Sequence, residues 1–83
     1  MSNKNNHNNS VLHNLLLELL GQDIESIVFG VNSDYTTIIF NDVNVRTFDK
    51  CQSVIETLLS FNIIHVLDYI SKDGLYTYYI KFQ

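Results

Sequence analysis

The stretch that decides the fold is the C-terminal segment Asn62–Gln83, NIIHVLDYISKDGLYTYYIKFQ. Two runs of apolar and aromatic residues, Ile63–Ile70 and Leu75–Phe82, flank the pair Asp73-Gly74. This pair favours a tight turn, because aspartate and glycine tolerate the positive φ angles that a two-residue hairpin loop requires. The segment therefore predicts a β-hairpin.

The segment before the hairpin, Thr47–Phe61, predicts an amphipathic α-helix. Its apolar residues fall on one face of a 3.6-residue repeat, and Thr47 is the expected N-cap. The residues of this face are Phe48, Cys51, Val54, Ile55, Leu58 and Leu59. A leucine-rich pattern predicts another helix over Ser10–Leu20, which Gly21 is expected to end.

The residues between the two helices predict an antiparallel meander. β-branched and aromatic residues indicate strands at Ile24–Val31 and Tyr35–Phe40, with a short third strand at Val43–Arg46. The expected order is α-β-β-β-α-β-β, an α+β fold whose antiparallel sheet is covered by helices on one face. Residues 10–83 are expected to form one small domain. The asparagine-rich segment Met1–Asn9 is expected to be a flexible tail, because it lacks a set of apolar groups to bury.

The composition limits the class of protein. A net charge of −4 has the wrong sign for a protein whose main task is to bind phosphate backbones. The single cysteine, Cys51, cannot form an internal disulfide, which is untypical of a small secreted scaffold. No segment approaches the ~20 apolar residues that span a bilayer, and Met1–Asn9 lacks the apolar stretch of a signal peptide. A cytoplasmic location without membrane contact is therefore expected.

The sequence offers no set of residues with catalytic or metal-binding spacing. Cys51 lies on the apolar face of its helix, where a thiol behaves as a small hydrophobe. His7, His13 and His65 fall in the tail, a helix and a strand, and with Cys51 they give no metal-ligand pattern. We therefore expect a protein that is not an enzyme and that binds no cofactor.

The segment Val54–Phe82, VIETLLSFNIIHVLDYISKDGLYTYYIKF, resembles the second half of a winged-helix domain. In that family a recognition helix leads through a short aliphatic segment, here Phe61–Ile64, into a hairpin wing. The resemblance implies a DNA-binding regulator. The basic residues outside the tail are Arg46, Lys50, Lys72 and Lys81. The first half of the chain departs from the family, because Ile24–Arg46 predicts strands where a winged-helix domain has another helix.

The hairpin carries more apolar surface than one face of a sheet needs. Alternation places Tyr76, Tyr78, Ile80 and Phe82 on one face, and Leu75, Thr77 and Tyr79 on the other. A small sheet covered on one side should show polar residues on the other, so this surface is expected to contact a partner. The predicted protein-binding residues are Tyr69, Tyr76, Tyr78, Tyr79 and Phe82, with Lys81 and Asp68 as charges at the rim.

The sequence thus predicts a small non-enzymatic protein-binding module. An inhibitor, an adaptor or an accessory subunit, of the kind that phages and other mobile elements encode, fits this pattern. The partner is another protein or a second copy of the chain, as in a homodimer, bound by occlusion or by strand addition at a sheet edge. The winged-helix regulator is the alternative, with nucleic acid as the less expected partner.

Overall fold

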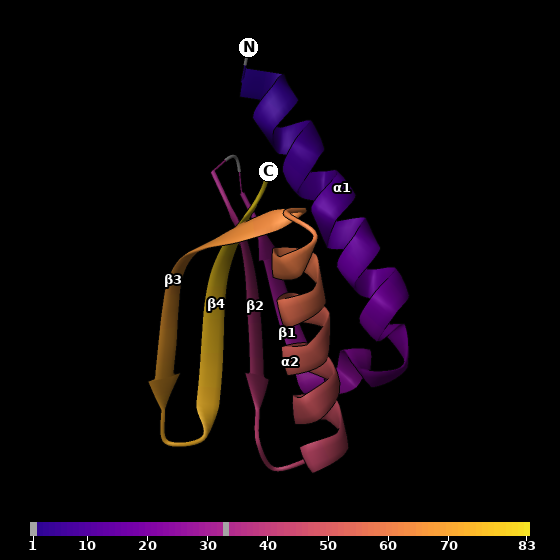
Figure 1. Ribbon diagram of the computed structural model, residues 1–83, viewed down its shortest axis with the longest axis vertical. Coiled ribbons are helices and arrows are strands. Elements are labelled where there is room, and N and C mark those ends of the chain that lie inside the picture. Colours follow the sequence, from indigo (N-terminus) through magenta and orange to yellow (C-terminus); the bar gives the residue numbers. More distant parts are fainter. Residues whose placement is uncertain (1, 33) are drawn as a thin grey trace.

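The computed structural model has two α-helices on one face of a four-stranded antiparallel sheet (Figure 1). It describes the backbone of residues 2–32 and 34–83, and the side chains of residues 10–23, 25–32 and 34–83. The elements are α1 (Ser2–Leu20), the 3-10 segment η1 (Gly21–Ser26), β1 (Ile27–Val31), β2 (Thr36–Asn41), α2 (Val45–Ser60), β3 (Ile64–Lys72) and β4 (Leu75–Phe82). This arrangement confirms the predicted α+β class and the antiparallel sheet.

The sheet has the strand order β1-β2-β4-β3, and each neighbouring pair of strands is antiparallel. β2 and β4 are the central strands, while β1 and β3 form the two edges. The hairpin of β3 and β4 turns at Asp73 and Gly74, whose φ angles are 54° and 79°. These positive angles confirm the tight turn that the Asp-Gly pair predicted.

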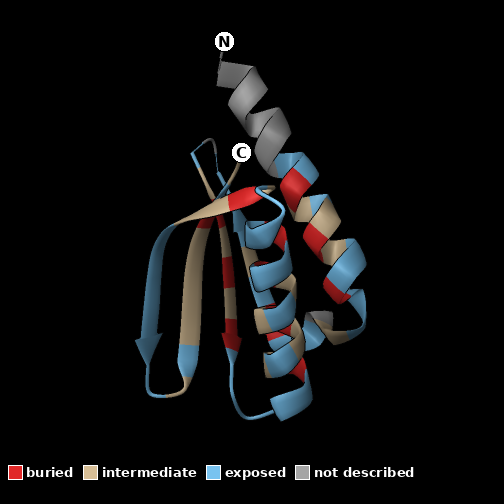
Figure 2. Cartoon of the chain, viewed as in Figure 1, coloured by how far each residue is buried: buried red, intermediate tan, exposed pale blue. Residues whose placement is uncertain are grey.

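Both helices pack on the same face of the sheet. The His13 ring of α1 contacts Phe29 of β1 at 5.4 Å between centroids, and the Phe48 ring of α2 contacts Phe40 of β2 at 5.9 Å. Phe29 and Phe40 share a face, because Phe40 pairs with Ile27, two residues before Phe29 on β1. The buried core between the layers consists of Leu12, Leu16, Leu20, Ile27, Ile38, Phe40, Cys51, Ile55, Leu58, Ile64 and Ile80 (Figure 2).

The predicted third strand at Val43–Arg46 is wrong. The amide of Val43 donates to the side chain of Asn41 at 3.0 Å, and this local turn follows the end of β2. Asn44 then caps α2 by accepting from the amide of Thr47 at 3.2 Å, so the helix begins at the next residue. The predicted N-cap, Thr47, lies inside the first turn. Two asparagine side chains satisfy backbone donors here, and this outweighs the strand preference of the valines.

The first half of the chain differs from the prediction mainly at the ends of its elements. The helix expected over Ser10–Leu20 forms the C-terminal part of α1, with Leu12, Leu16 and Leu20 in the core. The strand expected over Ile24–Val31 begins only at Ile27, because the residues before it form η1. The flexible tail predicted for Met1–Asn9 falls on residues whose side chains lie outside the described part of the structure, and it stays a prediction.

Candidate protein-binding site

Strand β4 separates the predicted binding residues into two groups. Tyr76 and Tyr78 pair with the core residues Phe40 and Ile38 of β2, so both tyrosines face the helices. Tyr79, which follows Tyr78 and pairs with Thr37, points to the opposite side, which we call the open face. The helix side carries Tyr69, Tyr76, Tyr78 and Phe82, and the open face carries Asp68, Tyr79 and Lys81.

The tyrosines on the helix side belong to an aromatic cluster. The rings of Tyr76 and Tyr78 both stack on Phe40 at 5.9 Å between centroids, and Tyr69 lies 4.6 Å from Tyr78. The Tyr78 hydroxyl donates to Gln52 Oε1 of α2 at 3.1 Å. Burial raises the pKa of the Tyr78 phenol, so its proton stays available for this hydrogen bond. These contacts make Tyr78 part of the packing between the sheet and α2.

Tyr76 ties the hairpin to the loop after β2. Its hydroxyl donates to Asp42 Oδ2 at 3.3 Å, and the amide of Asp42 donates to the carbonyl of Gly74 at 3.0 Å. Burial, followed by the negative charge of Asp42, raises the pKa of the Tyr76 phenol. Phe82, another predicted binding residue, packs against the core beside its strand partner Ile64. These side chains therefore have structural contacts of their own.

The open face is rich in apolar and aromatic side chains, although neither α1 nor α2 packs on it. Val28, Ile70 and Leu75 lie on this face and are 61, 47 and 48% exposed. Ile39 and Tyr79 lie at its centre, on β2 and β4. A sheet face in contact with water usually carries polar residues, whereas this face combines Ile39, Tyr79 and the exposed apolar side chains with two central threonines, Thr37 and Thr77, and charges at its margin. Such a composition is typical of a protein–protein interface.

A β-bulge in β3 changes which side chains reach the open face. Val66 pairs with Ile80 and Asp68 pairs with Tyr79, so Leu67 is an extra residue in β3. In a regular ladder, Asp68 would lie one rung further along β4 and would face the helices. The bulge therefore brings both Leu67 and Asp68 next to Tyr79.

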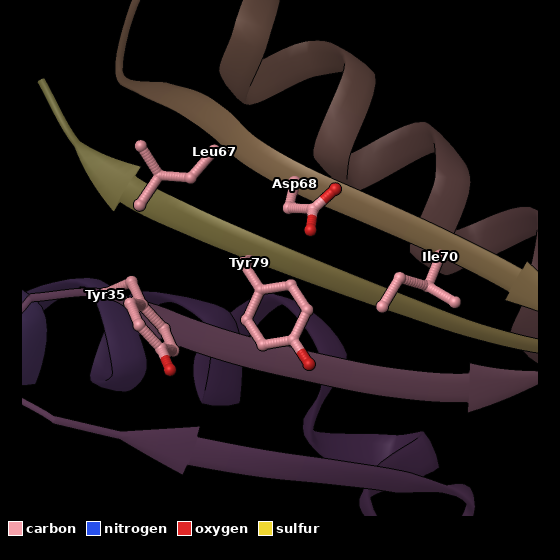
Figure 3. Close-up of a pocket in the computed structure, with 5 residues that line it drawn as sticks. All are labelled: Tyr35, Leu67, Asp68, Ile70 and Tyr79. Atoms are coloured by element: carbon pink, nitrogen blue, oxygen red, sulfur yellow. The ribbon is translucent and has the colours of Figure 1, made fainter.

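A hollow of about 360 Å³ lies beside the bulge. Its lining residues, which we call the tyrosine hollow, are Tyr35, Leu67, Asp68, Ile70 and Tyr79 (Figure 3). The rings of Tyr35 and Tyr79 meet at 84°, with centroids 5.3 Å apart. Asp68 Oδ1 accepts from the amide of Tyr69 at 2.8 Å, which orients the carboxylate. Among the described residues, no Lys, Arg or His side chain forms an ion pair with Asp68.

Sequence reasoning found only part of this hollow. Asp68 and Tyr79 were predicted, and Lys81 lies two residues beyond Tyr79 on the same face, opposite His65. Tyr35, Leu67 and Ile70 were not predicted. Their participation depends on β2 lying next to β4 and on the bulge, neither of which leaves a local signal in the sequence.

Cys51, His13 and His65 lie on three different elements, α2, α1 and β3. Cys51 is fully buried, and burial raises the pKa of its thiol to about 11, so the reactive thiolate is scarce at neutral pH. His13 packs on Phe29, while His65 lies in β3, and His7 falls outside the described side chains. Within the described residues, no group of three or more His, Cys, Asp and Glu side chains is placed to hold a metal ion.

The arrangement of helices differs from that of a winged-helix domain. The segment where that family has a second helix forms β1 and β2 instead. Lys50 of α2 forms an ion pair with Asp23 at 3.2 Å. One of the basic side chains that phosphate contact would need therefore already has an acidic partner. None of the helices that the structure describes is long and apolar enough to cross a membrane.

Comparisons of the chain with protein-family profiles, with curated proteins and with solved structures give no match.

Proposed function

We propose that this protein is a non-enzymatic binding module that attaches to another protein through the open face of its sheet. The observation that carries the proposal is an uncovered sheet face whose centre holds Ile39 and Tyr79 beside two threonines and whose flanks expose Val28, Ile70 and Leu75. Burying apolar surface of this kind contributes roughly 25 cal/mol per Å², so contact with a partner is favourable.

The open face is a better binding surface than the edge of β3. The bulge at Leu67 interrupts the regular ladder of β3, and the charges of Asp68 and Lys72 lie along the same strand. Bulges and charged side chains are the features that discourage an added strand at a sheet edge. The proposed mechanism is therefore occlusion of the partner's surface by a sheet face, as expected of an inhibitor, adaptor or accessory subunit.

The proposal keeps two further expectations from the sequence. A role in a phage or another mobile element stays part of it, as does a cytoplasmic location, where a lone thiol stays reduced. A homodimer is the form of the proposal in which the open faces of two copies meet. Sedimentation of the purified chain distinguishes this form, because self-association makes the apparent mass depend on concentration.

The test is an affinity capture from lysate of the native host with matched variants. Tyr79→Ser removes an aromatic side chain from the open face, and Phe61→Ser removes one that is 71% exposed at the end of α2. A protein recovered in stoichiometric amounts by the wild type and by Phe61→Ser, and lost with Tyr79→Ser, supports the proposal. Equal recovery by both variants contradicts it.

A nuclease treatment of the same lysate separates the winged-helix alternative. Recovery that persists after nuclease indicates a protein partner, whereas recovery that collapses indicates nucleic acid. A titration with duplex DNA at two salt concentrations gives independent information, since phosphate contacts produce a steep dependence on salt.

A further inference from the structure

We propose that the tyrosine hollow binds the guanidinium group of an arginine side chain presented by the partner protein. This inference rests on the proposed function, because it names the chemistry by which the open face recognises its partner. The hollow combines two perpendicular tyrosine rings, two aliphatic side chains and one carboxylate, which is a set of groups suited to a planar cation.

The two rings provide faces for the cation. Tyr35 and Tyr79 meet at 84° with centroids 5.3 Å apart, so their rings form a corner rather than a closed stack. Figure 3 shows Tyr79 between Tyr35 and Ile70, with Leu67 and Asp68 on the neighbouring strand. A cation in this corner can lie over the face of a tyrosine ring, where the negative side of the ring quadrupole attracts it.

The carboxylate supplies the opposite charge. Asp68 Oδ1 accepts from the amide of Tyr69 at 2.8 Å, and this bond holds the group in place while leaving Oδ2 free to accept from a ligand. No described basic side chain pairs with Asp68, and the chain as a whole carries a net charge of −4. The long-range field and the local carboxylate therefore both favour a positively charged ligand.

One neighbouring positive group, Lys81, limits the strength of the site. Lys81 of β4 pairs with His65 of β3. The pair of Val66 and Ile80 separates these two residues from the pair of Asp68 and Tyr79. Lys81 is exposed, so its flexible side chain can turn into solvent when a cation enters the hollow. The positive charge of Lys81 still repels a bound cation, so removing this charge is expected to strengthen cation binding.

Arginine fits this site better than lysine. Its guanidinium is planar and weakly hydrated, so it can stack on a tyrosine face while donating two parallel N–H groups to a carboxylate. The aliphatic part of the arginine side chain can lie along Leu67 and Ile70, which are 49 and 47% exposed.

The experiment compares two peptides that differ only in charge. Acetyl-Gly-Gly-Arg-Gly-Gly-amide and the same peptide with citrulline, the neutral isostere of arginine, are titrated into the ¹⁵N-labelled full chain. Amide shifts of Asp68, Tyr69 and Tyr79 report binding. The arginine peptide is expected to bind about five- to twenty-fold more tightly, from the cation–π and ion-pair contributions together.

Two variants test the sign of the electrostatics. Asp68→Asn keeps an oxygen that can accept from the Tyr69 amide, so it preserves the local geometry and removes only the charge. This variant is expected to weaken binding of the arginine peptide about two- to five-fold and to leave binding of the citrulline peptide unchanged. Lys81→Gln is expected to strengthen arginine binding about two-fold, since it removes a repulsive charge at an exposed position.

The results separate this inference from the proposed function. Equal shifts with both peptides, no shifts with either, or weaker arginine binding in Lys81→Gln overturn the arginine inference. If capture of the partner still depends on Tyr79, the proposed function stands in each of these cases. If capture does not depend on Tyr79 while the arginine peptide binds selectively, the proposed function fails and the hollow remains a cation site.

Discussion

Adjacent tyrosines on β4 should respond very differently to the same substitution. Tyr78 faces the helices, stacks on Phe40 and donates to Gln52, whereas Tyr79 lies on the open face and contacts the ring of Tyr35. Replacing either residue by serine costs the same loss of strand preference in the same central strand. The difference in unfolding free energy between the two variants therefore reports the packing of each face.

The magnitude follows from the contacts that are lost. Removing the Tyr78 ring exposes on the order of 100 Å² of apolar surface, or about 2 kcal/mol at 25 cal/mol per Å². Loss of the hydrogen bond to Gln52 adds about 1 kcal/mol. Tyr79→Ser loses mainly one ring pair, about 0.5–1 kcal/mol. The two variants should thus differ by about 2 kcal/mol.

The assay is urea unfolding followed by far-ultraviolet circular dichroism, with thermal unfolding as a second measurement. For a domain of this size, 1 kcal/mol shifts Tm by about 4–8 °C, so Tyr78→Ser should melt about 8–16 °C below Tyr79→Ser. Tyr78→Phe keeps the ring and should cost only about 1 kcal/mol. Equal destabilisation by the two serine variants, or a larger loss in Tyr79→Ser, would refute the assignment of the two faces.

Three further predictions follow from single features of the structure. Deleting Leu67 removes the extra residue of the bulge and keeps every rung, so it should cost less than about 1 kcal/mol. Deleting Ile70 instead reverses the faces of the residues before it and should lower the free energy of unfolding in urea by about 2 kcal/mol or more. Similar losses of stability in the two deletion variants would contradict the register. The Cys51 thiol, whose pKa is raised to about 11 from an ordinary 9.0, should react with a thiol reagent at least ~100-fold more slowly in the folded chain than in urea. Fast reaction in the folded state would show that Cys51 is accessible. The hydrogen bond from Lys50 holds the pKa of Asp23 below its ordinary 3.8, so this carboxylate stabilises the fold above about pH 4 and stops doing so as the pH falls through its folded pKa. The stability gap between wild type and Asp23→Asn should therefore narrow below about pH 4, and a constant gap would exclude the ion pair as its cause.

Local patterns were enough to predict most of the elements. The C-terminal hairpin, its Asp73-Gly74 turn and the helix before it follow from alternation, turn residues and a 3.6-residue repeat, all of which act over a few neighbours. The alternation of β4 was also predicted, and it places Tyr76 and Tyr78 opposite Tyr79 as observed. What the pattern could not show is which side the helices cover, since both sides of the strand carry tyrosine.

The features that the sequence did not reveal depend on contacts between distant residues. The prediction of a third strand was wrong because the side chains of Asn41 and Asn44 accept hydrogen bonds from nearby backbone amides. A strand-preference scale for Val43 and Val45 does not include these bonds. The bulge at Leu67 cannot be read from the segment itself, because VLDYI is compatible with a regular strand. The tyrosine hollow needs this bulge together with the adjacency of β2 and β4, so its members could not be grouped in advance.

The alternation of β4 also has a consequence for how this protein can evolve or be redesigned. Its even-numbered residues, Tyr76 to Phe82, stabilise the fold, while the odd-numbered Leu75, Thr77 and Tyr79 face outward. Under the proposed function, substitutions at the outward positions change partner specificity at little cost in stability. A library randomised at those three positions would explore new binding specificities on a scaffold that stays folded.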